Sequence, residues 1–277
     1  MTEDLHSARR KDDRPSFAVV GDNTIDRYVG AGEAEFIGGN ALNVAAQLGL
    51  AAERVVYFGA VGADPEAELI AGGLSRSGVS TSGLVVIPGE TALTQIRLTR
   101  DGDRVFERED FGVTAEYYPD APALEELAAA DWVHIGMLPR AGELRNELLA
   151  RNPAVVISQD CAVSSGHDGL AVAFESVGED ALDAKSRATA ALAAGARLAV
   201  ITRGARGSVA YDGDTWWQQD ALPTDVLDTT GAGDSFIAGF VASRCRGASV
   251  QQALLQGSAW ASATCRHRGG YPQEAVR

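Results

Sequence analysis

The chain alternates short apolar runs with helix-like stretches, and few folds accommodate that order. The apolar runs cover residues 17–22, 55–62, 131–136, 154–160 and 198–204. The helix-like stretches between them cover residues 41–48, 66–77, 123–130, 142–150 and 184–194. Such alternation is typical of βαβ units, in which helices cover both faces of a mainly parallel sheet. We therefore expect one large α/β domain whose ligands bind where strands such as FAVVGD end.

Two segments interrupt this alternation. Residues 91–113 alternate apolar and polar side chains on either side of Asp101-Gly102, which is a strong signal for a β-hairpin. Residues 27–37 are short and rich in glycine, so they could add a strand to that hairpin instead of forming a crossover helix. We expect both segments to form a small antiparallel β lid beside the main sheet. A second hairpin is predicted over residues 208–218.

The N-terminal segment and the cysteines indicate where the protein resides. Residues 1–16 contain no apolar run, so we predict a disordered tail before a single domain spanning residues 17–277. Without a signal-peptide core or a stretch of 18 apolar residues, neither secretion nor contact with a membrane is indicated. The three cysteines lie far apart and lack metal-ligand spacing, which argues against disulfides and zinc. A cytoplasmic protein is expected.

The charge balance excludes two classes of protein. Lys and Arg number 24 against 38 Asp and Glu, a net charge of -14, whereas binding of nucleic acid needs the opposite sign. The only lysines are Lys11 and Lys185, and neither follows a glycine, so a P-loop of the GxxxxGK[ST] type is excluded. The 31 glycines, accompanied by only nine prolines, are expected at particular turns and loops.

The segment DTTGAGDSF, residues 228–236, is the strongest candidate for a chemical site. Apolar residues follow Asp234 at helical spacing, so Gly231–Asp234 are predicted at a helix N-terminus, where backbone N–H groups and the helix dipole attract anions. Asp234 could there accept a proton from a hydroxyl that attacks a bound phosphoryl group. Taken alone, the same pattern also describes a capping aspartate beside a tight turn.

The longer motifs resemble a known family. DTTGAGDSFIAGF resembles the C-terminal signature of the ribokinase/PfkB family of carbohydrate and nucleoside kinases, and GGNALNVA followed by GAVGAD resembles its N-terminal signature. The resemblance covers about residues 17–270. It implies a ribokinase-like three-layer α/β/α core with a mainly parallel sheet and a small antiparallel β lid. It also implies an ATP-dependent kinase that uses Mg²⁺, with a homodimer formed through the lid.

Site roles follow from the resemblance, position by position. Asp234 matches the catalytic base, and the anion hole for the transferred phosphate matches Gly231, Ala232 and Gly233. Asp228 and Thr230 match a loop that holds a monovalent cation, K⁺, in many members. The sugar-binding positions match Asp26, Gly39, Asn40 and Asn43, and Asp22, which stands at the end of a predicted strand, could join them.

The nucleotide side matches the family less closely. The TxGxxG nucleotide loop matches Thr202, Gly204 and Gly207, which outside the family context would only indicate a turn. Many members carry an Asn-x-x-Glu element that organises Mg²⁺ and phosphates. Here Glu179 matches the acid, but Ser176 stands in place of the asparagine, and its hydroxyl has a shorter reach.

The substrate expected from the resemblance is a small sugar or a sugar-amine. Within the family, the sequence most resembles the fructoselysine 6-kinases, which phosphorylate a sugar-amine conjugate. Fructokinase-like, ribokinase-like and nucleoside-kinase-like substrates stay open. So does a sugar or nucleotide sensor without turnover, whereas an NAD-dependent oxidoreductase is disfavoured because the GxGxxG fingerprint is absent.

Overall fold

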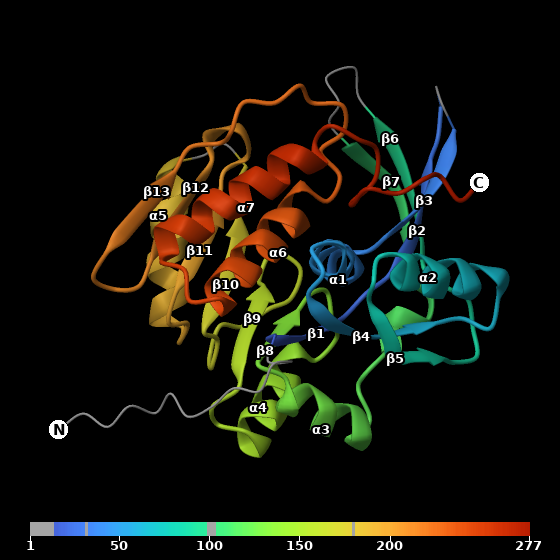
Figure 1. Cartoon of the computed structure of the whole chain (residues 1–277), viewed down its shortest axis with the longest axis horizontal. Helices are drawn as coiled ribbons and strands as arrows, with labels where there is room; N and C mark the ends of the chain where they lie inside the picture. The colour runs from blue at the N-terminus through green and yellow to red at the C-terminus, as the bar shows by residue number, and fades with distance from the viewer. Residues whose placement is uncertain (1–13, 31–32, 99–103, 179–180) are drawn as a thin grey trace.

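The computed structural model describes residues 14–30, 33–98, 104–178 and 181–277 (Figure 1). The larger sheet comprises β1 (Ser16–Val20), β4 (Arg54–Val61), β5 (Ser80–Val86), β8 (Trp132–Ile135), β9 (Val156–Asp160), β10 (Val172–Ser176), β11 (Ala199–Thr202), β12 (Ser208–Tyr211) and β13 (Trp216–Gln219). The helices are α1 (Asn40–Leu50), α2 (Pro65–Arg76), α3 (Ala121–Ala129), α4 (Ala141–Arg151), α5 (Ala181–Ala193), α6 (Ala232–Cys245) and α7 (Val250–Thr264), with short 3₁₀ turns η1 (Gly112–Glu116) and η2 (Gly204–Arg206).

The nine-stranded sheet has the order β13-β12-β11-β10-β9-β8-β1-β4-β5. Its strands run parallel from β5 to β11, and only β12 and β13 are antiparallel additions. The chain passes from β1 outward to β4 and β5, then returns to β8 on the other side of β1. The order of the strands therefore reverses between β1 and β8, and in open α/β sheets ligands bind at the carboxyl ends of the strands at such a point.

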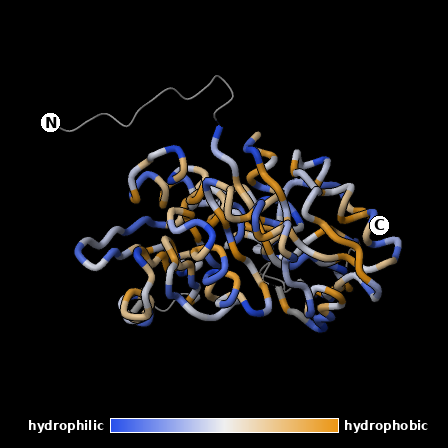
Figure 2. The backbone as a smooth tube through the Cα atoms, turned by 90° about the horizontal axis from the view of Figure 1, so that it is seen from below, coloured by the Kyte–Doolittle hydropathy of each residue, from blue (hydrophilic) through white to orange (hydrophobic). Residues whose placement is uncertain are grey.

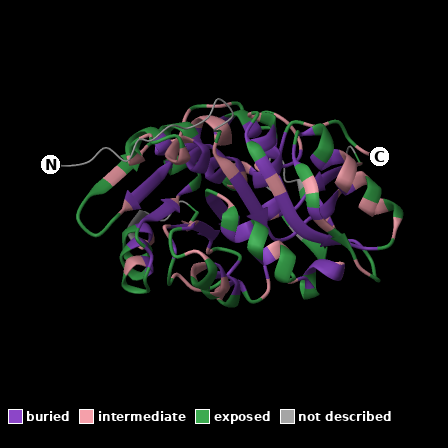
Figure 3. Cartoon of the chain, turned by 60° about the horizontal axis from the view of Figure 1, so that its bottom comes forward, coloured by how far each residue is buried: buried purple, intermediate pink, exposed green. Residues whose placement is uncertain are grey.

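Helices cover both faces of this sheet because its central strands are apolar on both sides. Hydrophobic segments run through the middle of the molecule (Figure 2). Within β1, Phe17 and Val19 join the core beneath α1, α6 and α7, whereas Ala18 and Val20 join the core beneath α3, α4 and α5. The strands between these layers are buried and the outer surfaces of the helices are exposed (Figure 3). The predicted three-layer α/β/α core is confirmed.

The lid is a separate four-stranded sheet with the order β3-β2-β6-β7. It is built from β2 (Thr24–Tyr28), β3 (Ala34–Gly38), β6 (Leu93–Leu98) and β7 (Arg104–Asp110). Two antiparallel hairpins meet through β2 and β6, and this one pair is parallel. Tyr28, Phe36 and Ile96 form its small apolar cluster. The segment 27–37 thus contributes parts of two strands, whereas we expected it to add one.

Some predictions fall outside the described part of the chain. The turn at Asp101-Gly102 and residues 1–13 of the predicted tail lie there, so the domain boundary at residue 16 stays a prediction. The hairpin predicted over residues 208–218 is confirmed by β12 and β13. Among the described helices, none is both long and apolar enough to cross a membrane.

Candidate active site

Gly231 is the N-cap residue directly before α6, and its backbone has a φ of 70°. A Cβ at Gly231 would lie 2.3 Å from the Cα of Gly270, so the two backbones approach as closely as only glycine permits. The Ala232 N–H donates to the carbonyl of Thr229 over 3.2 Å, which uses one of the three predicted anion donors within the turn. Gly233 is exposed, and a Cβ built on it would meet no described atom within 4 Å. The surface above Gly233 is therefore open.

Asp234 stands in the first turn of α6 and is held by two asparagines of α1. Asn40 Nδ2 donates to Asp234 Oδ1 over 2.8 Å, and Asn43 Nδ2 donates to Asp234 Oδ2 over 2.8 Å. A carboxylate has about four acceptor sites, so these two amide hydrogen bonds are compatible with Asp234 accepting a proton from a hydroxyl. Asn43 is buried, and its Oδ1 has no hydrogen-bond partner among the described residues, which suits an acceptor for a ligand hydroxyl.

Asp22 follows β1 and caps α1 from outside the helix. Its Oδ2 accepts from the Asn40 N–H and its Oδ1 accepts from the Ala41 N–H, both over 2.9 Å. Burial raises the pKa of Asp22 to about 6, although these two hydrogen bonds act in the opposite direction. Gly39 shapes the entry to α1, since its φ is 113° and a Cβ there would lie 2.5 Å from the Cα of Asn23.

Sequence reasoning missed Asp160, at the end of β9. Its Oδ2 accepts from Asn40 Nδ2 over 2.8 Å, so one amide group links Asp160 to Asp234. Burial raises the pKa of Asp160 as well. Its position at the end of a predicted strand could have identified it, because the same kind of position identified Asp22. Together with the Asn40 N–H bond to Asp22, Asn40 gathers three carboxylates around one residue.

Asp26 belongs to the lid. It lies on β2 and is 4% exposed, and a Cβ at Gly38 would lie 2.1 Å from its Oδ2. Gly38 thus leaves the space that the Asp26 carboxylate occupies. The structure therefore brings Asp22, Asn40 and Asn43 to Asp234, and it holds Asp26 against β3 on the lid side.

The predicted nucleotide residues share another part of the same sheet edge. Ser176 and Thr202 are paired neighbours at the carboxyl ends of β10 and β11, and Ser176 is exposed. Gly204 and Gly207 have φ values of 53° and 77°, and a Cβ at Gly207 would lie 2.0 Å from the carbonyl oxygen of Gln219. These glycines close a tight turn between β11 and β12. Glu179 lies outside the described residues.

Asp228 links three segments of the chain. Its Oδ1 accepts from the Thr230 N–H over 2.9 Å, and its Oδ2 accepts from the Gly269 N–H over 3.0 Å and from the Tyr28 hydroxyl over 2.6 Å. The Thr230 hydroxyl, 3.0 Å away, donates to the Tyr28 hydroxyl oxygen, because the single proton of Tyr28 goes to Asp228. Asp228 Oδ1 thus accepts one hydrogen bond and Oδ2 accepts two, and the role of Asp228 and Thr230 in binding K⁺ stays a prediction. Tyr28 was not among the predicted site residues.

The described residues do not offer a cage for Mg²⁺. No group of three or more histidines, cysteines, aspartates and glutamates close enough to hold a metal occurs among them. Mg²⁺ commonly keeps several waters and binds through substrate phosphates with one or two carboxylates, so this donor set suits an ion that enters with a nucleotide. Asp160 is one of the three carboxylates that accept hydrogen bonds from Asn40, and it is 8% exposed. It ends β9, the strand next to β10.

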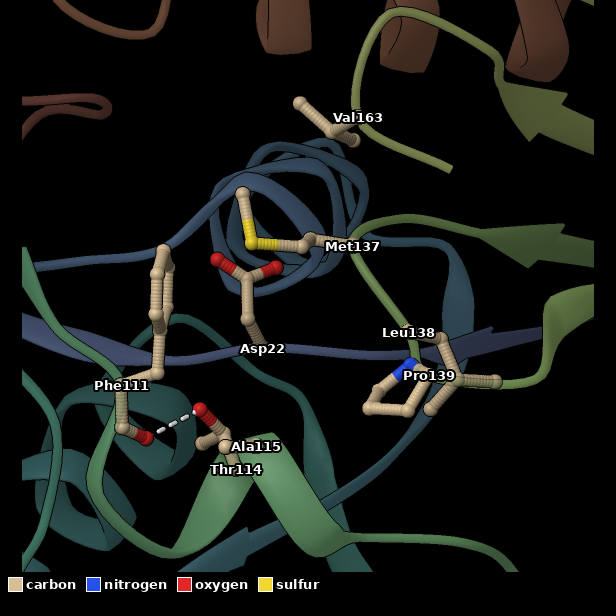
Figure 4. A pocket seen from close by; sticks show the side chains of 8 residues that line it. All are labelled: Asp22, Phe111, Thr114, Ala115, Met137, Leu138, Pro139 and Val163. Atoms are coloured by element: carbon tan, nitrogen blue, oxygen red, sulfur yellow. Dashed lines mark hydrogen bonds between the residues drawn. The ribbon is translucent and has the colours of Figure 1, made fainter. Parts of the chain in front are cut away.

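A cavity of about 310 Å³ opens over Asp22 at the point where the strand order reverses (Figure 4). Its walls come from the end of β1, the segment after β7, and the loops after β8 and β9. Site and cavity together therefore occupy the carboxyl edge of the sheet between β1 and β11, as expected for a doubly covered α/β fold.

Comparisons with known proteins agree with this geometry. The sequence profile of the pfkB family carbohydrate kinases matches residues 30–152 and 163–275. The fructoselysine 6-kinase of Shigella flexneri is 34% identical over 266 residues, covering 92% of this chain and 99% of that protein. The fructosamine kinase of Bacillus subtilis is 31% identical over 270 residues, covering 92% and 93%.

Solved structures share the fold. The ribokinase of Arabidopsis thaliana complexed with ribose and ATP superposes with a TM-score of 0.81 at 21% identity, covering 92% of this chain and 94% of that one. The ribokinase of Thermotoga maritima gives 0.79 at 17% identity, covering 93% and 94%. The profile spans most of the sequence, and the kinase relatives align over nearly their whole lengths. The chain accordingly belongs to the pfkB family of carbohydrate kinases and is a sugar phosphotransferase.

Proposed function

We propose that this protein transfers the γ-phosphoryl group of ATP to a hydroxyl of a fructose-type sugar that carries an amine, with Asp234 as the base. The observation that carries the proposal is the carboxylate of Asp234, held by the amide groups of Asn40 and Asn43 at the open N-terminus of a 14-residue helix. The names of the fructoselysine and fructosamine kinase relatives support the sugar-amine.

The chemistry at Asp234 is a proton transfer coupled to phosphoryl transfer. The substrate hydroxyl loses its proton to the carboxylate, its oxygen bonds to the γ-phosphorus, and the bond from that phosphorus to the β,γ-bridging oxygen breaks, which releases ADP. The fixed amides of Asn40 and Asn43 aim the carboxylate before substrate arrives, so no reorientation is needed during the reaction. Bound Mg²⁺ would neutralise charge on the phosphates.

Two further parts of the molecule support transfer to a sugar in preference to water. The N-terminus of α6 supplies a positive dipole end and the uncovered surface at Gly233, both suited to the negative charge on the transferred phosphate. The lid carries Asp26 and Tyr28, so a sugar bound beneath it would be shielded from water during transfer. A homodimer through the lid stays a prediction, which light scattering on the purified protein would test.

The experiment is a panel assay of ADP release with ATP and Mg²⁺ over fructosamines, fructose, ribose and nucleosides. We expect the highest kcat/KM for a fructosamine. A higher value for ribose or a nucleoside would contradict the proposed substrate, and saturable binding without ADP release from any compound would indicate a sensor instead of an enzyme.

Asp234→Asn tests the base, with Asp120→Asn as its matched control. Both aspartates stand at helix N-termini, and Asp120 accepts from the Ala123 N–H as the N-cap of α3. We expect Asp234→Asn to lower kcat by about 10²–10⁴-fold, as is usual for loss of a general base, while Asp120→Asn leaves kcat unchanged. Equal kcat values for Asp234→Asn and wild type would contradict the assignment of the base.

A further inference from the structure

The cavity over Asp22 has a chemistry that the reacting hydroxyl does not need. Phe111, Ala115, Met137 and Val163 line it with carbon and sulfur (Figure 4). The hydroxyl of Thr114, another lining residue, already donates to the Phe111 carbonyl over 2.6 Å. Asp22 is the single ionisable side chain among the lining residues. The cavity therefore suits a group that is apolar over most of its length and cationic at one end.

The rim of the cavity exposes apolar side chains to water. Phe111 is 42% exposed and Val163 is 36% exposed, and they belong to segments that follow β7 and β9. A bound alkyl chain would cover both, and removal of apolar surface from water is the main source of affinity in such pockets. A free sugar, with a hydroxyl on nearly every carbon, would gain little from this contact.

The charges around Asp22 favour a cationic ligand. Asp22 and Asp160 both hydrogen-bond Asn40, and within the described part of the chain no arginine or lysine pairs with either carboxylate. Two buried carboxylates near each other disfavour the ionised state of both, and an approaching ammonium group would relieve this. The occupant should therefore place its positive charge near Asp22.

The position of the cavity links it to the reacting centre. Asn40 donates through its backbone to Asp22 and through its side chain to Asp234, over 2.9 and 2.8 Å. A sugar whose acceptor hydroxyl faces Asp234 thus has Asp22 on the other side of Asn40. A substituent on the end of the sugar remote from that hydroxyl would reach the cavity.

We propose that this cavity is a subsite for the N-substituent of a fructosamine, with the secondary ammonium group facing Asp22 and the alkyl chain lying between Phe111 and Val163. The inference rests on the proposed function and adds that the protein selects substrates by what is attached to the sugar amine. Specificity then resides in the segments after β7 and β9 as well as in the sugar-binding residues.

The first test compares kcat/KM for fructose, 1-amino-1-deoxyfructose, and fructosamines with N-alkyl chains of increasing length. We expect a gain of about fourfold per methylene until the cavity is filled. An alkyl ether of fructose with the same chain length serves as the uncharged match, and we expect it to be at least about tenfold poorer than the amine. Equal kcat/KM for all chain lengths, or for ether and amine, would overturn the subsite.

The second test fills the cavity from its rim. Ala115 is exposed on the short turn η1, so Ala115→Phe can enlarge the side chain without repacking the core; Ala150→Phe, at an exposed position of α4, is the matched control. We expect Ala115→Phe to lower kcat/KM for long-chain fructosamines by about tenfold or more, with 1-amino-1-deoxyfructose within twofold of wild type. Ala150→Phe should change neither.

The outcomes separate the two proposals. If Ala115→Phe affects short and long substrates equally, or affects neither, the subsite is refuted while phosphorylation of fructosamines stands. If wild-type protein phosphorylates no fructosamine but does phosphorylate another sugar, the proposed substrate class and the subsite both fail.

Discussion

Gly233→Ala separates the needs of the fold from those of the phosphate site. Gly233 is the second residue of α6, its φ lies outside the left-handed region, and a Cβ there would meet no described atom within 4 Å. For the fold alone, alanine should be the better residue, because glycine loses more conformational freedom on entering a helix. The reaction needs the opposite, since a methyl group above Gly233 would occupy the space proposed for the phosphate.

The magnitudes can be worked out for each effect. Glycine in a helix costs about 0.5–1 kcal/mol relative to alanine, so Gly233→Ala should raise the free energy of unfolding by up to that amount and Tm by about 1–3 °C. Displacing phosphate from one backbone donor should lower kcat by about 10²–10³-fold. Gly142→Ala is the matched control, because Gly142 is also the second residue of a helix and its added Cβ would make only a 3.5 Å contact with Arg145.

Urea unfolding and an ADP-release assay measure the two effects on the same preparations. We expect both variants to be as stable as wild type or more so, with activity lost only in Gly233→Ala. Retention of kcat within threefold of wild type by Gly233→Ala would refute the phosphate position above Gly233. Destabilisation of Gly233→Ala would instead contradict the open, unstrained backbone seen at this residue.

Two further predictions concern Asp228 and Asp22. Tyr28→Phe should lower the free energy of unfolding in urea by about 1–3 kcal/mol, because the buried Asp228 carboxylate loses the Tyr28 donor; an unchanged free energy of unfolding would contradict this. The raised pKa of Asp22, about 6 against 3.8 unfolded, means that the folded state binds this proton more tightly, so stability falls as pH rises from about 4 to 6. The fall should be at most on the order of 3 kcal/mol, and Asp22→Asn should remove it from urea-unfolding curves measured across this range; identical pH slopes for both proteins would refute the assignment.

Local pattern was sufficient for the elements of the core and for the helix at Asp234. The period of the apolar residues predicted strands such as β1 and β4 and helices such as α2, because a strand buried on both faces and a helix buried on one stripe leave different sequence signatures. The small residues before Asp234, together with the apolar spacing after it, likewise predicted the start of a helix. The family resemblance then marked Asn40 and Asn43 as sugar-binding positions, and Asp22 was added because it follows a predicted strand.

Other features depend on contacts between distant segments. Asn40 joins Asp160 to Asp234, and Tyr28 reaches Asp228 across 200 residues of sequence. Nothing in the local sequence of a tyrosine on a strand, or of an aspartate that follows one, indicates such a partner. The parallel pairing of β2 with β6 is a further example, since it depends on how two hairpins meet.

The sequence by itself determined the layered α/β architecture, the helix N-terminus at Asp234 and the exclusion of a P-loop, because each follows from local periodicity or residue type. Tertiary structure alone decided that Asn40 gathers three carboxylates, that Asp228 accepts hydrogen bonds from three segments of the chain, and that an apolar cavity opens over Asp22. The physical reason is that hydrogen-bond partners and cavities are set by the relative placement of whole elements, which side-chain periodicity does not encode.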